Sequence, residues 1–164
     1  MMAEFKKAMK AEIGRSALLP AVAAVALDAG ELKKAEAYAN EMLTKAKTTN
    51  RKSVFPSFGS FPSGNAVHHG NLILGRLALA AGNLTKAKKH LIEAGKTTGS
   101  PQLNSFGPNM MLAKELLEKG EKEIVLEYFQ LCSKFWKMKR DRLKQWTDDV
   151  EQGRVPNFRA NLLY

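Results

Sequence analysis

Residues 68–101 read HHGNLILGRLALAAGNLTKAKKHLIEAGKTTGSP, and this stretch decides the fold that we expect. Apolar residues recur at helical spacing on both sides of Gly82, which predicts two amphipathic helices joined by a tight turn. Gly82 suits the left-handed conformation that ends a helix. Gly75 and Ala87 are small, so the two helices are able to approach closely. Pro101 ends the second helix. The stretch therefore predicts a helical hairpin.

The same intervals recur twice, which indicates a repeat. The upstream copy consists of Ala23, Gly30, Ala35, Ala39 and Met42, and the downstream copy of Ala113, Gly120, Val125, Phe129 and Cys132. Polar or acidic residues follow each glycine, as suits the first turn of a new helix. We therefore expect an all-α chain that forms a single domain, 1–164, with repeats at about 16–48, 65–98 and 106–138.

These units resemble tetratricopeptide repeats, two-helix modules with a small residue in the first helix, a glycine turn, an alanine and a late proline. The resemblance covers roughly residues 16–138 and implies an irregular solenoid of three antiparallel hairpins, with a capping helix at each end. Val125 departs from the alanine that the family favours, and no unit has the family's aromatic residue early in its first helix. The segments 99–120 and 127–136 also resemble a bacterial group of such proteins with uncharacterised function, which implies no catalytic residues.

Two segments flank the repeats as expected caps. Residues 2–13 predict a separate helix whose apolar face packs on the first repeat, and residues 139–164 predict a final helix followed by a tail that folds back. Pro20 is expected in the first turn of the first repeat, where proline is tolerated. Trp136 and Trp146 are expected in the core, because tryptophan contributes a large buried area.

Residues 49–64, TNRKSVFPSFGSFPSG, interrupt the repeats. Their phenylalanines alternate with proline and glycine, which favours neither a helix nor a regular strand. One interpretation is an ordered insertion that packs on the helical core. The other is a recognition loop that stacks on bases or holds a peptide. The residues concerned are Phe55, Phe58 and Phe61.

Composition narrows the class of protein. A single cysteine, Cys132, excludes an intramolecular disulfide and fits a reducing compartment, so we expect a cytoplasmic location. We expect no membrane span, because no apolar run reaches the roughly 18 residues that a span requires. The formal charge is +10. Residues 51–100 hold seven basic side chains and a single acidic one, Glu93. Such an excess attracts nucleic acid or acidic protein without choosing between them.

The tetratricopeptide resemblance implies a groove lined by the first helix of each unit. Arg76 and Lys114 occupy matching positions, so the two cations are expected to lie side by side and hold a carboxylate or an acidic peptide. The alternative is a pair of ordinary solvated cations. Asn71 and Asn109 also match and are expected nearer the edge of the groove. The main groove positions are His69, Leu72, Ile73, Arg76, Met110, Met111 and Lys114; further ones are Pro20, Ala24, Leu27, Ala80 and Gly107.

His68 and His69 form the most enzyme-like pattern of the chain. Adjacent helical residues project about 100° apart, so the pair is poorly placed to bind one metal ion. One of the two is expected to pack at the helix start. No phosphate-binding glycine loop or nucleophile motif occurs. We therefore predict a non-enzymatic protein- or peptide-binding scaffold without cofactor or metal. The alternatives are a nucleic-acid-binding accessory protein and a small-molecule or metal site at the histidine pair.

Overall fold

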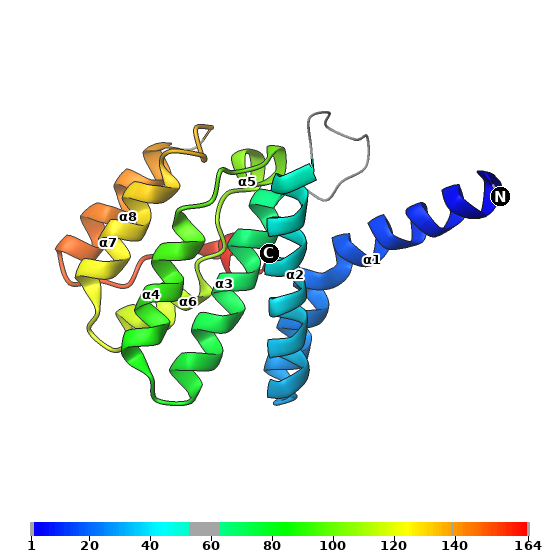
Figure 1. Cartoon of the computed structure of the whole chain (residues 1–164). Coiled ribbons are helices and arrows are strands. Elements are labelled where there is room, and N and C mark those ends of the chain that lie inside the picture. The colour runs from blue at the N-terminus through cyan, green and yellow to red at the C-terminus, as the bar shows by residue number, and fades with distance from the viewer. Residues whose placement is uncertain (1, 53–62, 139, 164) are drawn as a thin grey trace.

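The computed structural model describes residues 2–52, 63–138 and 140–163, and these are helical with no strand. Figure 1 shows the helices side by side in a broad layer, with the first half of α1 extending away from it. The elements are α1 (Met2–Asp28), α2 (Leu32–Lys52), α3 (Ser63–Ala80), α4 (Leu84–Gly95), α5 (Pro101–Phe106), α6 (Met111–Leu117), α7 (Lys122–Cys132), α8 (Arg140–Glu151) and the 3₁₀-helix η1 (Arg159–Leu162).

Glycine turns join α1 to α2, α3 to α4 and α6 to α7. Gly30, Gly82 and Gly120 have φ angles of 76°, 74° and 82°. At the second turn the Gly82 N–H donates to the Leu79 carbonyl at 3.0 Å, and the Asn83 N–H donates to the Ala78 carbonyl at 2.8 Å. This bonding satisfies carbonyls that the end of a helix otherwise leaves unpaired. The left-handed conformation predicted for Gly82 is confirmed, and Gly30 and Gly120, at the matching positions of the other two copies, adopt it too.

Small residues let α3 approach its neighbours closely. A Cβ atom added at Gly75 would lie 3.2 Å from the Cβ of His90 on α4 and would clash with the Leu112 side chain on α6. Ala87 and Leu91, on the facing side of α4, are fully buried. A larger residue at position 75 would therefore separate the helices, because packed interiors leave no room for an extra methyl group.

Two hydrophobic clusters hold the layer together. The smaller one joins α1 and α2 to the facing side of α3 through Ala23, Ala39, Met42 and Ile73, among others. The larger one runs from α3 to the C-terminal tail and includes aromatic rings in tilted and edge-to-face contacts. Trp136 and Trp146 lie in it at 0% and 4% exposure, 5.7 Å apart between ring centroids. Their predicted place in the core is confirmed.

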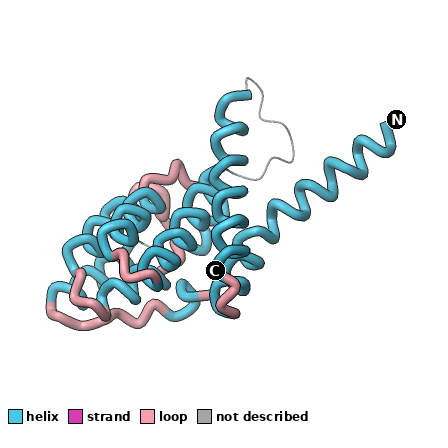
Figure 2. The backbone as a smooth tube through the Cα atoms, turned by 60° about the horizontal axis from the view of Figure 1, so that its bottom comes forward, coloured by secondary structure: helices cyan, strands magenta, loops and turns pink. Residues whose placement is uncertain are grey.

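The N-terminal prediction differs from the structure. Residues 2–13 do not form a separate cap, because α1 continues through Gly14 to Asp28. A glycine inside a helix costs only about 1 kcal/mol relative to alanine, which is too little to end a long helix. Pro20 lies well inside α1 and not in a first turn. Figures 1 and 2 both show the first half of α1 projecting from the body.

The segment between α4 and α6, expected as a linker, contains the short helix α5. Ser100 caps it, since its Oγ accepts a hydrogen bond from the Leu103 N–H at 3.0 Å, and Pro101 occupies the first helical position. Serine at the cap and proline at the next position are strong helix-start signals. The following helix starts at Met111, later than the start of the third repeat at about residue 106 that the sequence predicts.

The tail after α8 folds back on the body, as expected. Phe158 is buried against Phe129 and Trp146, with ring centroids 6.2 Å and 5.0 Å away. The Asn161 amide donates to the carbonyls of Phe106 and Pro108 at 3.2 Å and 2.9 Å. The tail therefore fixes the segment that joins α5 to α6.

We predict that Gly82→Ala lowers the free energy of unfolding by about 1–2 kcal/mol, because a Cβ atom disfavours the left-handed conformation by that amount. Gly82→Asn is the matched variant, since asparagine tolerates this conformation better. Nothing lies within 4 Å of a Cβ at this position, so the effect is one of backbone strain and not of packing. Urea unfolding measures both. Equal losses for the two variants would contradict the assignment.

Candidate functional site

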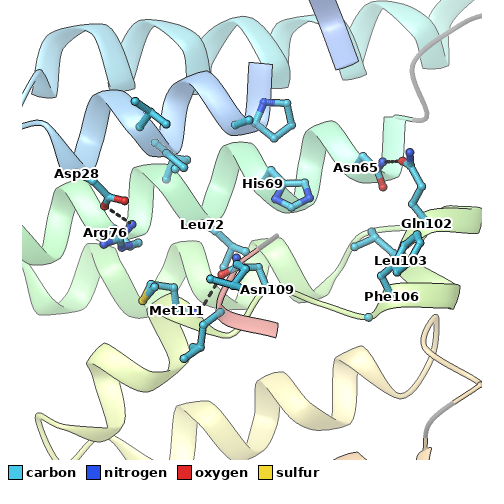
Figure 3. Close-up of a pocket in the computed structure, with 18 of the residues that line it drawn as sticks. Asp28, Asn65, His69, Leu72, Arg76, Gln102, Leu103, Phe106, Asn109 and Met111 are labelled. Atoms are coloured by element: carbon cyan, nitrogen blue, oxygen red, sulfur yellow. Dashed lines mark hydrogen bonds and ion pairs between the residues drawn. The ribbon is translucent and has the colours of Figure 1, made fainter. Parts of the chain in front are cut away.

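A groove of about 790 Å³ opens between α1, α3, α5 and the start of α6. We call this cavity the groove. Apolar surface dominates its walls, and the C-terminal tail closes one side of it through Leu162 and Leu163. Figure 3 shows the labelled side chains converging from these separate elements. Residues far apart in the sequence therefore build one site.

The α1 wall consists of small and apolar residues. Ala17, Pro20, Ala21, Ala24 and Val25 line the groove from this helix. Their spacing of three and four places them on one face, because an α-helix has 3.6 residues per turn. Val25 is 67% exposed and therefore leaves apolar surface at the rim.

The α3 wall carries four of the predicted groove residues. His69, Leu72, Ile73 and Arg76 all line the groove. Leu72 and Ile73 are 4% and 6% exposed, so they form a fixed apolar floor. His69 is half-buried, and it makes no hydrogen bond to any residue in the described part of the chain. Burial lowers its pKa to about 4, so the imidazole is neutral at pH 7.

Arg76 is held in a pair of salt bridges. Its Nε lies 2.9 Å from the Glu115 carboxylate on α6, and its Nη1 lies 3.3 Å from the Asp28 carboxylate at the end of α1. The Arg76 side chain is 18% exposed. The guanidinium therefore links three helices, and two carboxylates already balance its charge. The expectation of an unpaired cation that waits for an acidic ligand is wrong at this position.

Two predicted groove residues lie elsewhere. Lys114 does not line the groove; its ammonium lies 3.6 Å from Glu118 on its own helix. Met110 is fully buried in the larger core cluster, and its N–H donates to the Asn161 carbonyl at 2.7 Å. Because α6 begins only at Met111, its first residue faces the groove and Met110 faces the core. Leu27 and Ala80 are also absent from the lining, whereas Gly107 belongs to it.

His68 is a structural residue. Its side chain is fully buried between Tyr128 and Phe135, whose rings have centroids 6.5 Å and 6.0 Å away. The Asn109 N–H donates to its Nε2 at 3.1 Å, so the Nδ1–H donates to the Ala94 carbonyl at 3.2 Å. Burial, with a smaller contribution from the neighbouring His69, lowers its pKa to about 3. With both nitrogens engaged, it has no nitrogen left for a metal or ligand at the histidine pair.

The two predicted asparagines have different surroundings. Asn109 lines the groove, and its Oδ1 accepts a hydrogen bond at 2.9 Å from the N–H of Met111, the first residue of α6. Asn71 lies between α3 and α4, where its Oδ1 accepts from Nδ1 of His90 at 3.0 Å. Asn71 is therefore a contact between helices and not a groove residue.

Several residues that line the groove were not predicted from the sequence. Asn65, Gln102, Leu103 and Phe106 line the end of the groove near α5, and Asp28 lines the opposite end. Phe106 is 60% exposed, an unusual exposure for a large aromatic side chain. The cap at Ser100 with Pro101 was the available signal for α5. Phe55, Phe58 and Phe61 lie outside the residues that the structure describes.

Within residues 2–52, 63–138 and 140–163, no group of three metal-binding side chains comes together. Over the same residues, no helix combines the length and the apolar character that a membrane span needs. Comparison with protein-family models, with curated proteins and with solved structures gave no match for this chain.

We predict that acid destabilises the protein through His68. Its pKa is lower in the folded chain than the 6.5 of the unfolded one, so its contribution is complete above pH 6.5 and is lost progressively as the pH falls toward 3. The unfolded chain gains the proton first, which makes the free energy of unfolding fall by about 2 kcal/mol between pH 7 and pH 5 from this residue. Urea unfolding at both pH values measures the loss.

His68→Gln tests the assignment, because glutamine keeps hydrogen-bonding groups but does not titrate. The variant is expected to be less stable at pH 7 and to lose about 2 kcal/mol less than the original chain between pH 7 and pH 5. A variant with the same pH dependence as the original chain would contradict the role of His68.

Proposed function

We propose that the chain is a non-enzymatic scaffold of three tetratricopeptide-like hairpins that binds an apolar segment of a partner protein in the groove. The hairpins are α1–α2, α3–α4 and α6–α7, each turned at a left-handed glycine. The first helix of each hairpin contributes to the groove. This arrangement supports the solenoid that the sequence resemblance implies.

The exposed apolar rim of the groove carries the proposal. Val25, Phe106 and Leu163 are 67%, 60% and 84% exposed around a cavity with a buried apolar floor. Exposed apolar surface around a concave site marks a place where another molecule binds, because the removal of this apolar surface from water is favourable.

Charge favours an uncharged occupant. Asp28 and Arg76 are the two residues of the groove lining that carry a full charge at pH 7, and they form a salt bridge with each other. Glu115 adds a second negative charge beside Arg76. An acidic peptide would meet this carboxylate pair around the guanidinium. An apolar segment is therefore a better partner than the acidic peptide that we expected from the sequence.

The extent of the apolar surface favours a peptide over a small molecule. Leu18 and Val22 on α1 are 62% and 41% exposed, and with Val25 they continue the apolar surface along the helix at steps of four and three. A helical or extended segment of a partner is long enough to cover both this stripe and the groove. His69 adds a ring nitrogen able to bond to the backbone of the bound segment.

A site-specific photo-crosslinker tests the proposal. We predict that benzoylphenylalanine at position 106 crosslinks to one or a few proteins of the source cell and that Val25→Gln reduces this yield several-fold. The matched control places the crosslinker at Met138, which is 67% exposed and lies outside the groove. Val155→Gln serves as the control substitution, because Val155 is also exposed and outside the groove.

The identity of the crosslinked peptide decides the outcome. A peptide with apolar residues at helical or alternate spacing, captured at position 106 and not at position 138, would support the proposal. The same proteins at both positions, or no protein at position 106, would overturn it.

Nucleic-acid binding is the second candidate, supported by the exposed face of α4. Lys86 and Lys89 are exposed there, and neither forms a salt bridge within the described residues. Burial is the main cause that lowers the pKa of His90, and the positive charges of Lys86 and Lys89 lower it further. The helix therefore presents an uncompensated positive potential, which attracts phosphate backbones.

For this candidate we predict that the double variant Lys86→Gln, Lys89→Gln weakens binding of a short fluorescent oligonucleotide and lowers the salt dependence by about two counterions. Fluorescence anisotropy at several salt concentrations measures both quantities. Lys47→Gln, Lys119→Gln is the matched control, since both lysines are exposed away from α4, Lys47 on α2 and Lys119 in the turn after α6. Equal effects of the two double variants would show attraction by net charge alone and contradict a site on α4.

A further inference from the structure

A second pocket, separate from the groove, lies between α8 and the C-terminal tail. Its volume is about 340 Å³, at the lower end of the roughly 300–1,000 Å³ typical of small-molecule sites. Trp146 and Phe158 lie at its base but are only 4% and 1% exposed, so most of the surface that the pocket offers to a ligand is polar. We call this cavity the arginine pocket, because Arg142 and Arg159 line it.

The two arginines have no partner of opposite charge. Neither Arg142 nor Arg159 forms a salt bridge with a residue in the part of the chain that the structure describes. The one acidic residue of the lining, Asp149, is bound instead by Arg154, whose Nη2 lies 2.5 Å from its Oδ1. The pocket lining therefore keeps two positive charges that are available to a ligand.

Neutral donors accompany the arginines. Gln145 and Asn157 also line the arginine pocket. The Oδ1 of Asn157 accepts a hydrogen bond from the Arg159 N–H at 3.2 Å, which leaves the amide nitrogen of Asn157 as a donor. Two guanidinium groups and two amides give more donors than the two oxygens of a carboxylate accept. A phosphate monoester, with three terminal oxygens and a charge near −2, matches this set better.

The backbone conformation of Arg159 indicates that the side chain has a role at this position. Its φ angle is 49°, and it is the one non-glycine residue with positive φ among those described. A residue with a Cβ is strained in this region, whereas glycine is not. A glycine would therefore suit the backbone better, and the arginine at this position contributes its guanidinium to the pocket.

We propose that the arginine pocket binds the phosphate group of a small phosphate monoester, with Arg142 and Arg159 as the charged contacts. This site is independent of the groove, since the two cavities share no lining residue.

Calorimetric titration of the purified chain tests the proposal with three probes at constant ionic strength: phenyl phosphate, inorganic phosphate and benzoate. We expect phenyl phosphate and inorganic phosphate to bind with a Kd on the order of 1 mM or tighter, and benzoate to bind at least about ten-fold more weakly, because the pocket recognises the phosphate group. Arg142→Gln and Arg159→Gly should each weaken phenyl phosphate binding by about ten-fold or more. Lys144→Gln, an exposed cation of the same helix outside the pocket, should leave it unchanged.

Arg159→Gly separates binding from folding. Because glycine suits the left-handed backbone, its melting temperature should equal or exceed that of the original chain while binding is lost. Absence of saturable phenyl phosphate binding up to about 20 mM, which corresponds to an affinity too weak for a specific site, would overturn the proposal. An equal loss with Lys144→Gln would overturn it too. Benzoate binding as tightly as phenyl phosphate would also overturn the assignment to a phosphate group.

Discussion

The buried imidazole of His68 is the contact on which the arrangement of the middle helices depends. It accepts the Asn109 N–H before α6 and donates to the Ala94 carbonyl near the end of α4, so one side chain of α3 joins three elements. A buried polar group is costly unless all its hydrogen bonds are made. Here both ring nitrogens are paired, and the ring orientation is therefore determined. His69, the next residue, is consequently directed into the groove.

The salt bridges of Arg76 give the groove a second fixed point. The guanidinium joins α3 to Asp28 at the end of α1 and to Glu115 on α6, so it holds both walls at one end of the cavity. Breaking a partly buried ion pair leaves one charge without its partner, which costs free energy. The intact pair adds little net stability, because both charges lose water, and its main effect is to hold the two groups in one geometry. Asn161 plays the corresponding part at the α5 end through its bonds to Phe106 and Pro108. These contacts therefore fix the shape of the groove within the chain itself.

Features encoded by neighbouring residues were predictable from the sequence. The left-handed turns at Gly30, Gly82 and Gly120 follow from local spacing, and the groove face of α3 follows from helical periodicity. Features that depend on distant residues were not. The carboxylates that pair with Arg76 lie 48 and 39 positions away, so its neutralised charge has no local signal. Met110 was misplaced because one residue turns a helix by about 100°, and α6 starts only at Met111. The spacing of residues in the sequence also gives no signal for the tail contacts that close the groove.

The C-terminal tail has a consequence for the order in which the molecule folds. The walls of the groove come from positions as far apart as Ala17 and Leu163, whereas each glycine turn joins helices that are adjacent in the chain. Contacts between distant residues require the closure of long loops and form slowly, while local helix pairs form quickly. The groove is therefore completed last, after the individual helix pairs. Partly folded chains lack the completed groove, so the binding that we propose there would be confined to molecules that have finished folding.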